Sequence, residues 1–115
     1  MWSYAHDGFT VHQIPALQDN YIYLIETDEM LACVDPAESK PVEAACGTLG
    51  RKLTHVLNTH HHWDHVGGNV ELKSRYGCAI VGPSYDATRI PALDQPVSEG
   101  KGLQLGNLDV SVLFV

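Results

Sequence analysis

Apolar runs alternate with short polar breaks in the first part of the chain, a pattern typical of short strands. Residues 10–14 and 21–26 are rich in β-branched and aromatic side chains, which favour strands, and residues 30–34 are an uninterrupted apolar run. Pro15 is predicted to end the first of these strands. Because only the polar residues Thr27-Asp28-Glu29 separate the second strand from the third, these two are predicted to form a hairpin.

A helical periodicity follows between Lys40 and Leu53. Apolar residues recur there at the i, i+3, i+4 and i+7 positions of one face, namely Val42, Ala45, Cys46 and Leu49. Ser39 is predicted to cap this helix, with Pro41 in its first turn. A short strand at 54–57 comes next, so the unit is strand–helix–strand, which favours parallel pairing.

The remaining predicted elements are shorter. They are a helix at 69–76 ended by Gly77, a strand at 78–81, an irregular stretch at 83–96, and a closing hairpin of 103–105 with 108–115. Alternating strands and helices predict an α/β fold with a mixed sheet and two helices. The 115 residues fit one domain, and because the chain stops inside the apolar run Val110–Val115, we expect that strand to be cut.

Composition narrows the class of protein. The chain is 44% hydrophobic and 18% charged, with a formal net charge of −7 from 14 acids against seven Lys plus Arg. This balance disfavours a nucleic-acid partner, and no apolar run is long enough for a membrane span. Three cysteines without paired spacing and no secretory signal indicate a reducing compartment, the cytoplasm or alternatively the mitochondrion.

A histidine cluster carries the candidate chemistry. Four of the seven histidines fall within residues 60–65, after a predicted strand and before Gly67-Gly68, where α/β proteins place ligand sites. His60 and His62 project to one side of an extended loop, whereas Asp64 and His65 follow a turn and point at a second position. A solvated histidine run or an affinity tag is the alternative, but a tag would lie at a terminus without the interruption by Trp63-Asp64.

These donors predict two divalent metal ions. Imidazole and carboxylate ligands without a thiolate suit zinc first, with iron or manganese as alternatives. We expect His60 and His62 to bind one ion, and Asp64 and His65 the other. Two ions about 3.5–4 Å apart share a bridging water and lower its pKa toward about 7.

Other polar and aromatic residues near the cluster have different expected roles. His61 lies between the two alternating ligands and is predicted to face away from the metals, and Trp63 is predicted to pack. The isolated histidines are expected to be structural or exposed; they are His6, His12 and His55. If the strands ending at Asp35 and Asn58 are neighbours, the Asp35 carboxylate would orient a ligand imidazole; the alternative is a simple Asp-Pro turn.

The pattern His60-x-His62-x-Asp64-His65 resembles the signature of the metallo-β-lactamase superfamily. Two stretches, 14–21 (IPALQDNY) and 58–69 (NTHHHWDHVGGN), resemble the glyoxalase II (hydroxyacylglutathione hydrolase) family more specifically. The resemblance implies an αββα sandwich with His60 and His62 on one metal and Asp64 and His65 on the other. It also matches Asp35 to the family's aspartate at the end of an early strand.

The resemblance implies a thioesterase. In that family a metal-bridging hydroxide attacks the carbonyl of S-lactoylglutathione, a small glutathione thioester, and releases lactate and glutathione. Asp64 would hold the nucleophile in line, so Asp64 and Asp35 are the candidate catalytic residues. The alternatives are an iron-dependent persulfide dioxygenase of the same superfamily and a non-catalytic metal-binding protein.

The chain departs from the family's pattern after His65, because no histidine follows it. In the family the remaining metal ligands and the glutathione-binding residues come later. We therefore expect residues 1–115 to be the N-terminal part of the catalytic domain, the first half of the sandwich truncated at a strand. Such a half would leave an apolar face uncovered and would be inactive alone.

Overall fold

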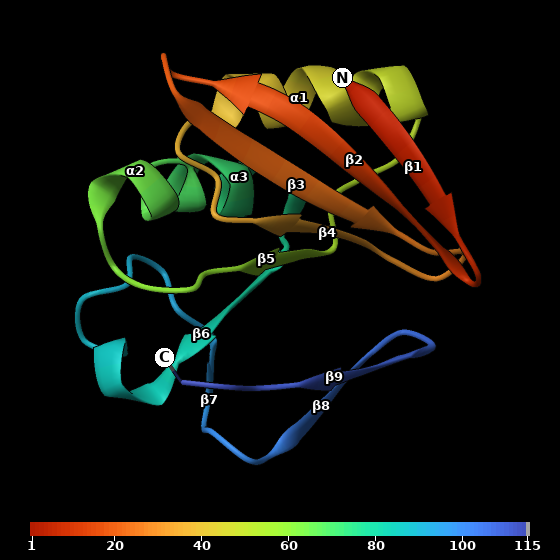
Figure 1. Ribbon diagram of the computed structural model, residues 1–115. Coiled ribbons are helices and arrows are strands. Elements are labelled where there is room, and N and C mark those ends of the chain that lie inside the picture. Colours follow the sequence, from red (N-terminus) through yellow and green to blue (C-terminus); the bar gives the residue numbers. More distant parts are fainter. Residues whose placement is uncertain (115) are drawn as a thin grey trace.

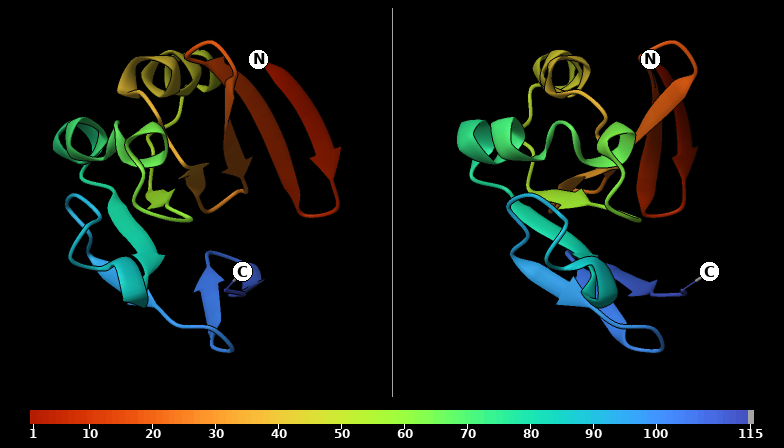
Figure 2. Two further views of the ribbon diagram at one scale, coloured as in Figure 1. Left: turned by 60° about the vertical axis from the view of Figure 1, so that its left-hand side comes forward. Right: turned by 90° about the vertical axis from the view of Figure 1, so that its left-hand side faces the viewer.

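The computed structural model describes residues 1–114. They form a twisted seven-stranded sheet, which has helices on one side and a two-stranded hairpin on the other (Figures 1 and 2). The strands are β1 (Trp2–His6), β2 (Phe9–Ala16), β3 (Asn20–Glu26), β4 (Leu31–Val34), β5 (His55–Leu57), β6 (Ala79–Pro83), β7 (Gln95–Val97), β8 (Gly102–Leu105) and β9 (Leu108–Ser111). The helices are α1 (Ser39–Leu49), α2 (Trp63–Val66), α3 (Asn69–Tyr76) and the 3-10 turn η1 (Ser84–Asp86). No helix in this part of the chain is both long and apolar enough to cross a membrane.

Strand order in the large sheet follows the chain, from β1 to β7. Strands β1 to β4 pair antiparallel, and β4 to β7 pair parallel, so the predicted mixed sheet is confirmed. The β3–β4 hairpin is also confirmed, with Glu26 opposite Leu31. Parallel pairing of Val34 with Leu57 confirms the strand–helix–strand unit and brings the ends of β4 and β5 together.

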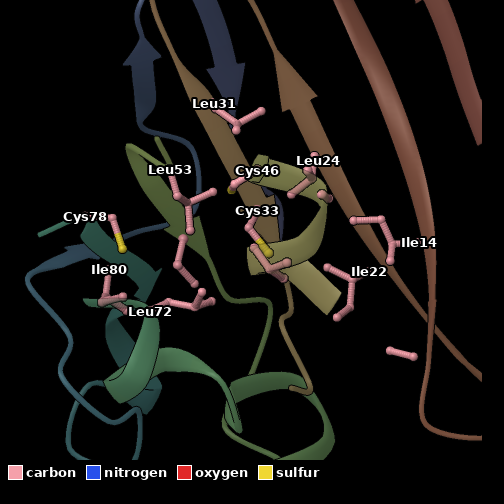
Figure 3. Packing of buried hydrophobic residues seen from close by; sticks show 14 of the residues in the cluster. Ile14, Ile22, Leu24, Leu31, Cys33, Cys46, Leu53, Leu72, Cys78 and Ile80 are labelled. Atoms are coloured by element: carbon pink, nitrogen blue, oxygen red, sulfur yellow. The ribbon is translucent and has the colours of Figure 1, made fainter. Parts of the chain in front are cut away.

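The core lies between the sheet and the helices α1 and α3 (Figure 3). The apolar face predicted for α1 is buried there, and Leu49 packs at its edge. On β4, Leu31 and Cys33 face this core, whereas Ala32 faces a second cluster formed with Leu105 of the β8–β9 hairpin. Strand β4 is therefore buried on both faces, as its uninterrupted apolar sequence indicates.

Two element boundaries were predicted wrongly. Strand β2 does not end before Pro15, which pairs with Tyr21 of β3. Because β1 pairs with β2 only as far as Gln13, no neighbour on that side needs the missing proline N–H. Helix α1 ends at Leu49 rather than at Leu53, because Gly50 adopts the left-handed conformation that terminates it (φ 66°).

The ends of other elements also differ from the predictions. Ser39 is the first residue of α1 rather than its cap, and its hydroxyl hydrogen-bonds to Glu71 of α3. Strand β7 contains Pro96 in a stretch expected to be irregular; as an edge strand it tolerates proline. Residues 112–114 of the predicted last strand lie beyond the end of β9 and pair with no strand, and Val115 lies outside the described residues.

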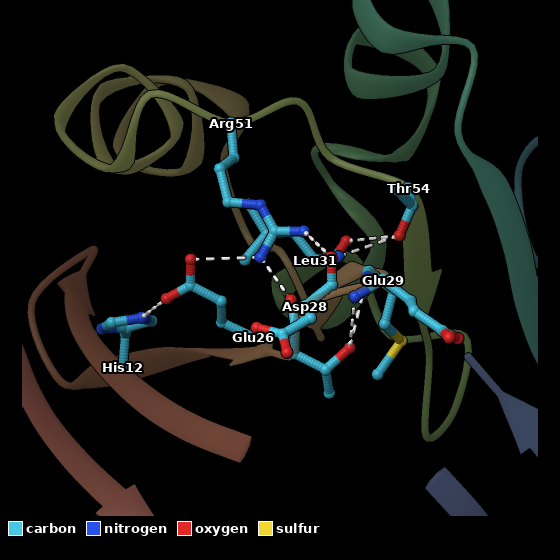
Figure 4. A network of polar contacts seen from close by, with 9 residues as sticks. His12, Glu26, Asp28, Glu29, Leu31, Arg51 and Thr54 are labelled. Atoms are coloured by element: carbon cyan, nitrogen blue, oxygen red, sulfur yellow. Dashed lines mark hydrogen bonds and ion pairs between the residues drawn. The ribbon is translucent and has the colours of Figure 1, made fainter. Parts of the chain in front are cut away.

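A network of polar contacts links the strands near the β1 edge of the sheet (Figure 4). The buried imidazole of His12 lies 2.7 Å from the hydroxyl of Ser3 through Nδ1 and 2.9 Å from the Glu26 carboxylate through Nε2. The other oxygen of Glu26 accepts from Arg51 at 3.2 Å. These contacts tie β1, β2 and β3 to the segment after α1, which gives His12 the structural role predicted for it.

Candidate metal centre

The histidine segment lies where two parallel strands end. Residues 58–62 lead from β5 into the short helix α2, and Asp35 follows directly after β4. Because β4 and β5 are neighbours in the sheet, their carboxyl ends meet at one edge, which is the usual place for ligands in α/β proteins.

Three imidazoles converge on this edge. The ring centroid of His60 lies 4.6 Å from that of His62 and 4.0 Å from that of His65. His60 and His62 thus lie on the same side of the loop, the arrangement that their i, i+2 spacing predicts. Desolvation and the neighbouring His65 lower the pKa of His60, which favours the neutral imidazole that metal ions require.

Asp35 connects the end of β4 to the loop. Its carboxylate accepts hydrogen bonds from the backbone N–H of Thr59 at 2.8 Å and from the Thr59 hydroxyl at 2.7 Å. The same carboxylate lies 3.0 Å from Nδ1 of His65, close enough for an ion pair but without hydrogen-bond alignment. Asp35 has φ 50°, a strained value of the kind found at functional sites.

Asp64 lies beside the other nitrogen of His65. Its Oδ2 is 3.5 Å from Nε2 of His65 and 3.4 Å from the side-chain amide of Asn20, which donates to it. Two ligands of a tetrahedral zinc ion with bonds of about 2.0–2.1 Å lie roughly 3.4 Å apart. The separation of these two atoms therefore fits a pair of ligands on one ion.

The donor set fits divalent metal ions, although the chain supplies the donors in pairs. In residues 1–114 no group of three or more His, Cys, Asp or Glu side chains surrounds a single point. The Asp35 carboxylate lies 3.0 Å from Nδ1 of His65, which leaves Nε2, on the side of Asp64, as the nitrogen that could bind a metal ion. The residues that would hold the ions are His60, His62, Asp64 and His65.

Two glycines let the loop approach the β4 end closely. A Cβ at Gly67 would lie 2.2 Å from the carbonyl oxygen of Ala37, and one at Gly68 would lie 3.0 Å from the backbone of Glu38. The N–H of Gly68 also donates to the carbonyl oxygen of Pro36 at 2.8 Å. Gly67-Gly68 is therefore needed for close packing between α2 and the segment after Asp35.

Two buried asparagines join the two ends of the loop. Asn69, at the start of α3, donates to the Asn58 side chain at 2.6 Å, and Asn58 donates to the carbonyl oxygen of His65 at 3.0 Å. Both residues are buried, Asn69 completely and Asn58 with 6% of its surface exposed. These hydrogen bonds hold the loop between β5 and α3 in place.

The two other aromatic residues of the segment, His61 and Trp63, differ in their surroundings. His61 points to Asp86, with Nδ1 3.0 Å from the carboxylate, so it does face a different partner from His60 and His62. The packing role predicted for Trp63 is wrong, because its side chain is 71% exposed. An apolar hollow of about 540 Å³ begins at Thr59 and His60 and continues between the sheet and the hairpin.

The fold and the histidine segment together indicate the superfamily to which the chain belongs. Residues 17–110 match the metallo-beta-lactamase superfamily, and the chain belongs to that superfamily. The structure of BJP-1, a subclass B3 metallo-beta-lactamase of Bradyrhizobium japonicum, superposes with a TM-score of 0.71 at 24% identity, covering 90% of this chain and 47% of that one. The predicted metallo-β-lactamase-type α/β fold is therefore confirmed.

Relatives narrow the resemblance within the superfamily. The chain is 47% identical over 105 residues to the hydroxyacylglutathione hydrolase of Rhodospirillum rubrum, covering 90% of this chain and 41% of that protein. It is 48% identical over 105 residues to the hydroxyacylglutathione hydrolase of Methylococcus capsulatus, with the same coverage of 90% and 41%. The chain thus spans less than half the length of these relatives.

Proposed function

We propose that the protein to which this chain belongs is a metal-dependent thioesterase that hydrolyses S-lactoylglutathione. One observation carries the proposal: at the joined ends of β4 and β5 the His60 ring lies 4.6 Å from that of His62 and 4.0 Å from that of His65, and the Asp64 carboxylate lies 3.5 Å from Nε2 of His65. The similarity to two hydroxyacylglutathione hydrolases supports the choice of substrate class. In this proposal zinc is the first choice of metal, and iron and manganese are the alternatives.

The chain's residues would serve this chemistry by binding and orienting. When bound, divalent ions polarise a carbonyl group and make water acidic enough to attack it at neutral pH. His60, His62, Asp64 and His65 would hold the ions, and Asp35 would orient the His65 ring by facing its Nδ1. Asn20 donates to the Asp64 carboxylate and would keep it in the position that a reacting water requires.

Turnover of S-lactoylglutathione by the whole protein tests this function. We expect hydrolysis, its loss on dialysis against a chelator, and its return when zinc is added. Replacing Asp64 by alanine should lower kcat/KM by about 10²–10³-fold while the protein stays folded. Asp109→Ala, which removes an exposed carboxylate on the hairpin, should leave turnover unchanged.

Three results would contradict the proposal. One is full thioester turnover by a preparation that contains no metal. Another is an Asp64→Ala protein that does not fold, since this would indicate a structural metal site. The third is oxygen consumption with glutathione persulfide in the absence of any thioester hydrolysis.

A further inference from the structure

A buried carboxylate reaches the middle of the histidine loop from a distant part of the chain. Asp86 belongs to η1, after β6, and its side chain is 3% exposed. One of its oxygens, Oδ2, lies 3.0 Å from Nδ1 of His61, and the other, Oδ1, lies 3.1 Å from Arg89. A carboxylate this deeply buried is held only where its hydrogen bonds are satisfied.

The core holds Asp86 in place. Its backbone carbonyl accepts from the N–H groups of Arg89 at 2.8 Å and Ile90 at 3.2 Å. The Ile90 side chain is buried and lies directly over Gly82 of β6, where an added Cβ would come within 2.7 Å of it. The carboxylate is therefore held firmly next to residues 60–62, the part of the loop whose side chains make few hydrogen bonds.

The side chains of residues 60–62 have few other contacts that would hold them in place. Within residues 1–114 the His60 imidazole hydrogen-bonds only to the adjacent Thr59 hydroxyl, at 2.9 Å, and His62 is exposed. In the described chain, the side chains of residues 60–62 make one hydrogen bond to another element, the bond from His61 to Asp86. The His61 ring packs edge-on against the His62 ring, with centroids 5.0 Å apart, and the His62 ring packs edge-on against the His60 ring at 4.6 Å, so fixing His61 restricts where the rings of His62 and His60 can lie.

We infer that Asp86 is a positioning residue of the metal centre, which anchors His61 so that His60 and His62 present their imidazoles together. The inference rests on the metal binding proposed above and adds a residue that touches no metal ligand directly. Arg89 does not have this function, because its side chain is 59% exposed and pairs with the oxygen that His61 does not use. The anchoring bond assigns the Nδ1–H tautomer to His61, whose N–H donates to Asp86.

The metal-free protein provides the first test, which depends neither on metal nor on activity. Long-range ¹H–¹⁵N correlation of the histidine rings should show His61 protonated at Nδ1 and unprotonated at Nε2 at a pH where its ring is neutral. The Asp86→Ala protein should lose this tautomer preference. A wild-type His61 that carries its proton on Nε2 would overturn the inference, whether or not the protein is a thioesterase.

Binding of Co²⁺ alone, followed by visible absorption against a competing chelator, provides the second test. We expect Asp86→Ala and His61→Ala each to weaken Co²⁺ binding by about 10–100-fold, and the double variant to be no weaker than either, because the two residues act as one unit. Asp86→Asn keeps an acceptor for the His61 N–H and should stay within about threefold of wild type. Arg89→Ala is the matched control and should also bind as wild type does.

The results that would overturn the anchor are distinct from those that would overturn the proposed function. Additive losses in the double variant, or wild-type Co²⁺ affinity in Asp86→Ala, would show that Asp86 does not act through His61. Equal weakening by Arg89→Ala would indicate a general loss of structure around η1. Should Asp86→Ala not fold, the His61→Ala and Asp86→Asn comparison and the wild-type tautomer still decide the question.

Discussion

Replacing Gly67 by alanine tests whether close packing of α2 on the segment after β4 builds the metal centre. The added Cβ would lie 2.2 Å from the Ala37 carbonyl oxygen and 2.9 Å from that of Trp63. Both are backbone atoms that cannot rotate away, so the backbone has to shift by roughly 1 Å. Overpacking of this kind costs about 1–3 kcal/mol, and loss of the bond from Gly68 to Pro36 would add about 1 kcal/mol.

We therefore expect Gly67→Ala to lower the free energy of unfolding by about 3 kcal/mol. The shift also separates Asp35 from the loop, so the affinity for Co²⁺ should fall with the stability. Urea unfolding followed by circular dichroism measures the first quantity, and chelator competition measures the second.

Gly47→Ala is the matched control. Gly47 lies within α1, and an added Cβ there meets nothing within 4 Å. Alanine is favoured over glycine inside a helix by about 0.5–1 kcal/mol, so this variant should be more stable than wild type. A Gly67→Ala protein that unfolds within about 0.5 kcal/mol of wild type would refute the packing argument.

Three further predictions follow from the contacts described above. Asp35→Ala should weaken Co²⁺ binding by about 10–100-fold, measured by chelator competition, and unchanged binding would contradict an orienting role. Asn58→Ala should lower the free energy of unfolding by about 1–3 kcal/mol in urea, because it leaves the buried Asn69 side chain and the His65 carbonyl oxygen without a partner; no change would show that the two asparagines do not hold the loop. Hydrogen bonding from His12, then Arg51, lowers the pKa of Glu26 against an opposing effect of desolvation. The stabilisation from Glu26 is therefore present above the ordinary glutamate pKa and is lost as the pH falls through the lowered pKa of the folded state. In unfolding experiments at decreasing pH, the stability advantage of wild type over Glu26→Gln should vanish. An advantage that does not change with pH would contradict this.

Helices and strands whose sequence pattern lies within one short segment could be predicted from the sequence. The heptad-like face of α1, the apolar run of β4 and the left-handed glycine after α3 each lie within one segment, and each was predicted correctly. Strand β1 was not predicted because all five of its side chains are exposed, so no burial constraint shaped its sequence.

The candidate ligands were visible in the sequence because they fall within six residues, 60–65. Of the residues that contact them, Asp35 was named from the sequence, because it ends a strand predicted to lie beside the one before the cluster. The others were not named, since each is a single polar residue without a pattern around it. Asn20 contacts Asp64 across 44 positions, and Asp86 contacts His61 across 25. Asn58 and Asn69 flank the cluster, but an asparagine beside a loop is common in turns and carries no signal of burial. Pairing of this kind is decided by tertiary packing.

The order of strands in the large sheet has a consequence for how the protein forms during translation. Each strand from β2 to β7 pairs with the strand made just before it, so every strand finds its partner already synthesised when it leaves the ribosome. Growth of the sheet can thus proceed by addition at one edge, and the antiparallel pairs from β1 to β4 close over short turns, which favours rapid folding of that part. The histidine loop takes up its position when β5 adds to β4, and η1 brings its carboxylate to that loop only after β6 has been added.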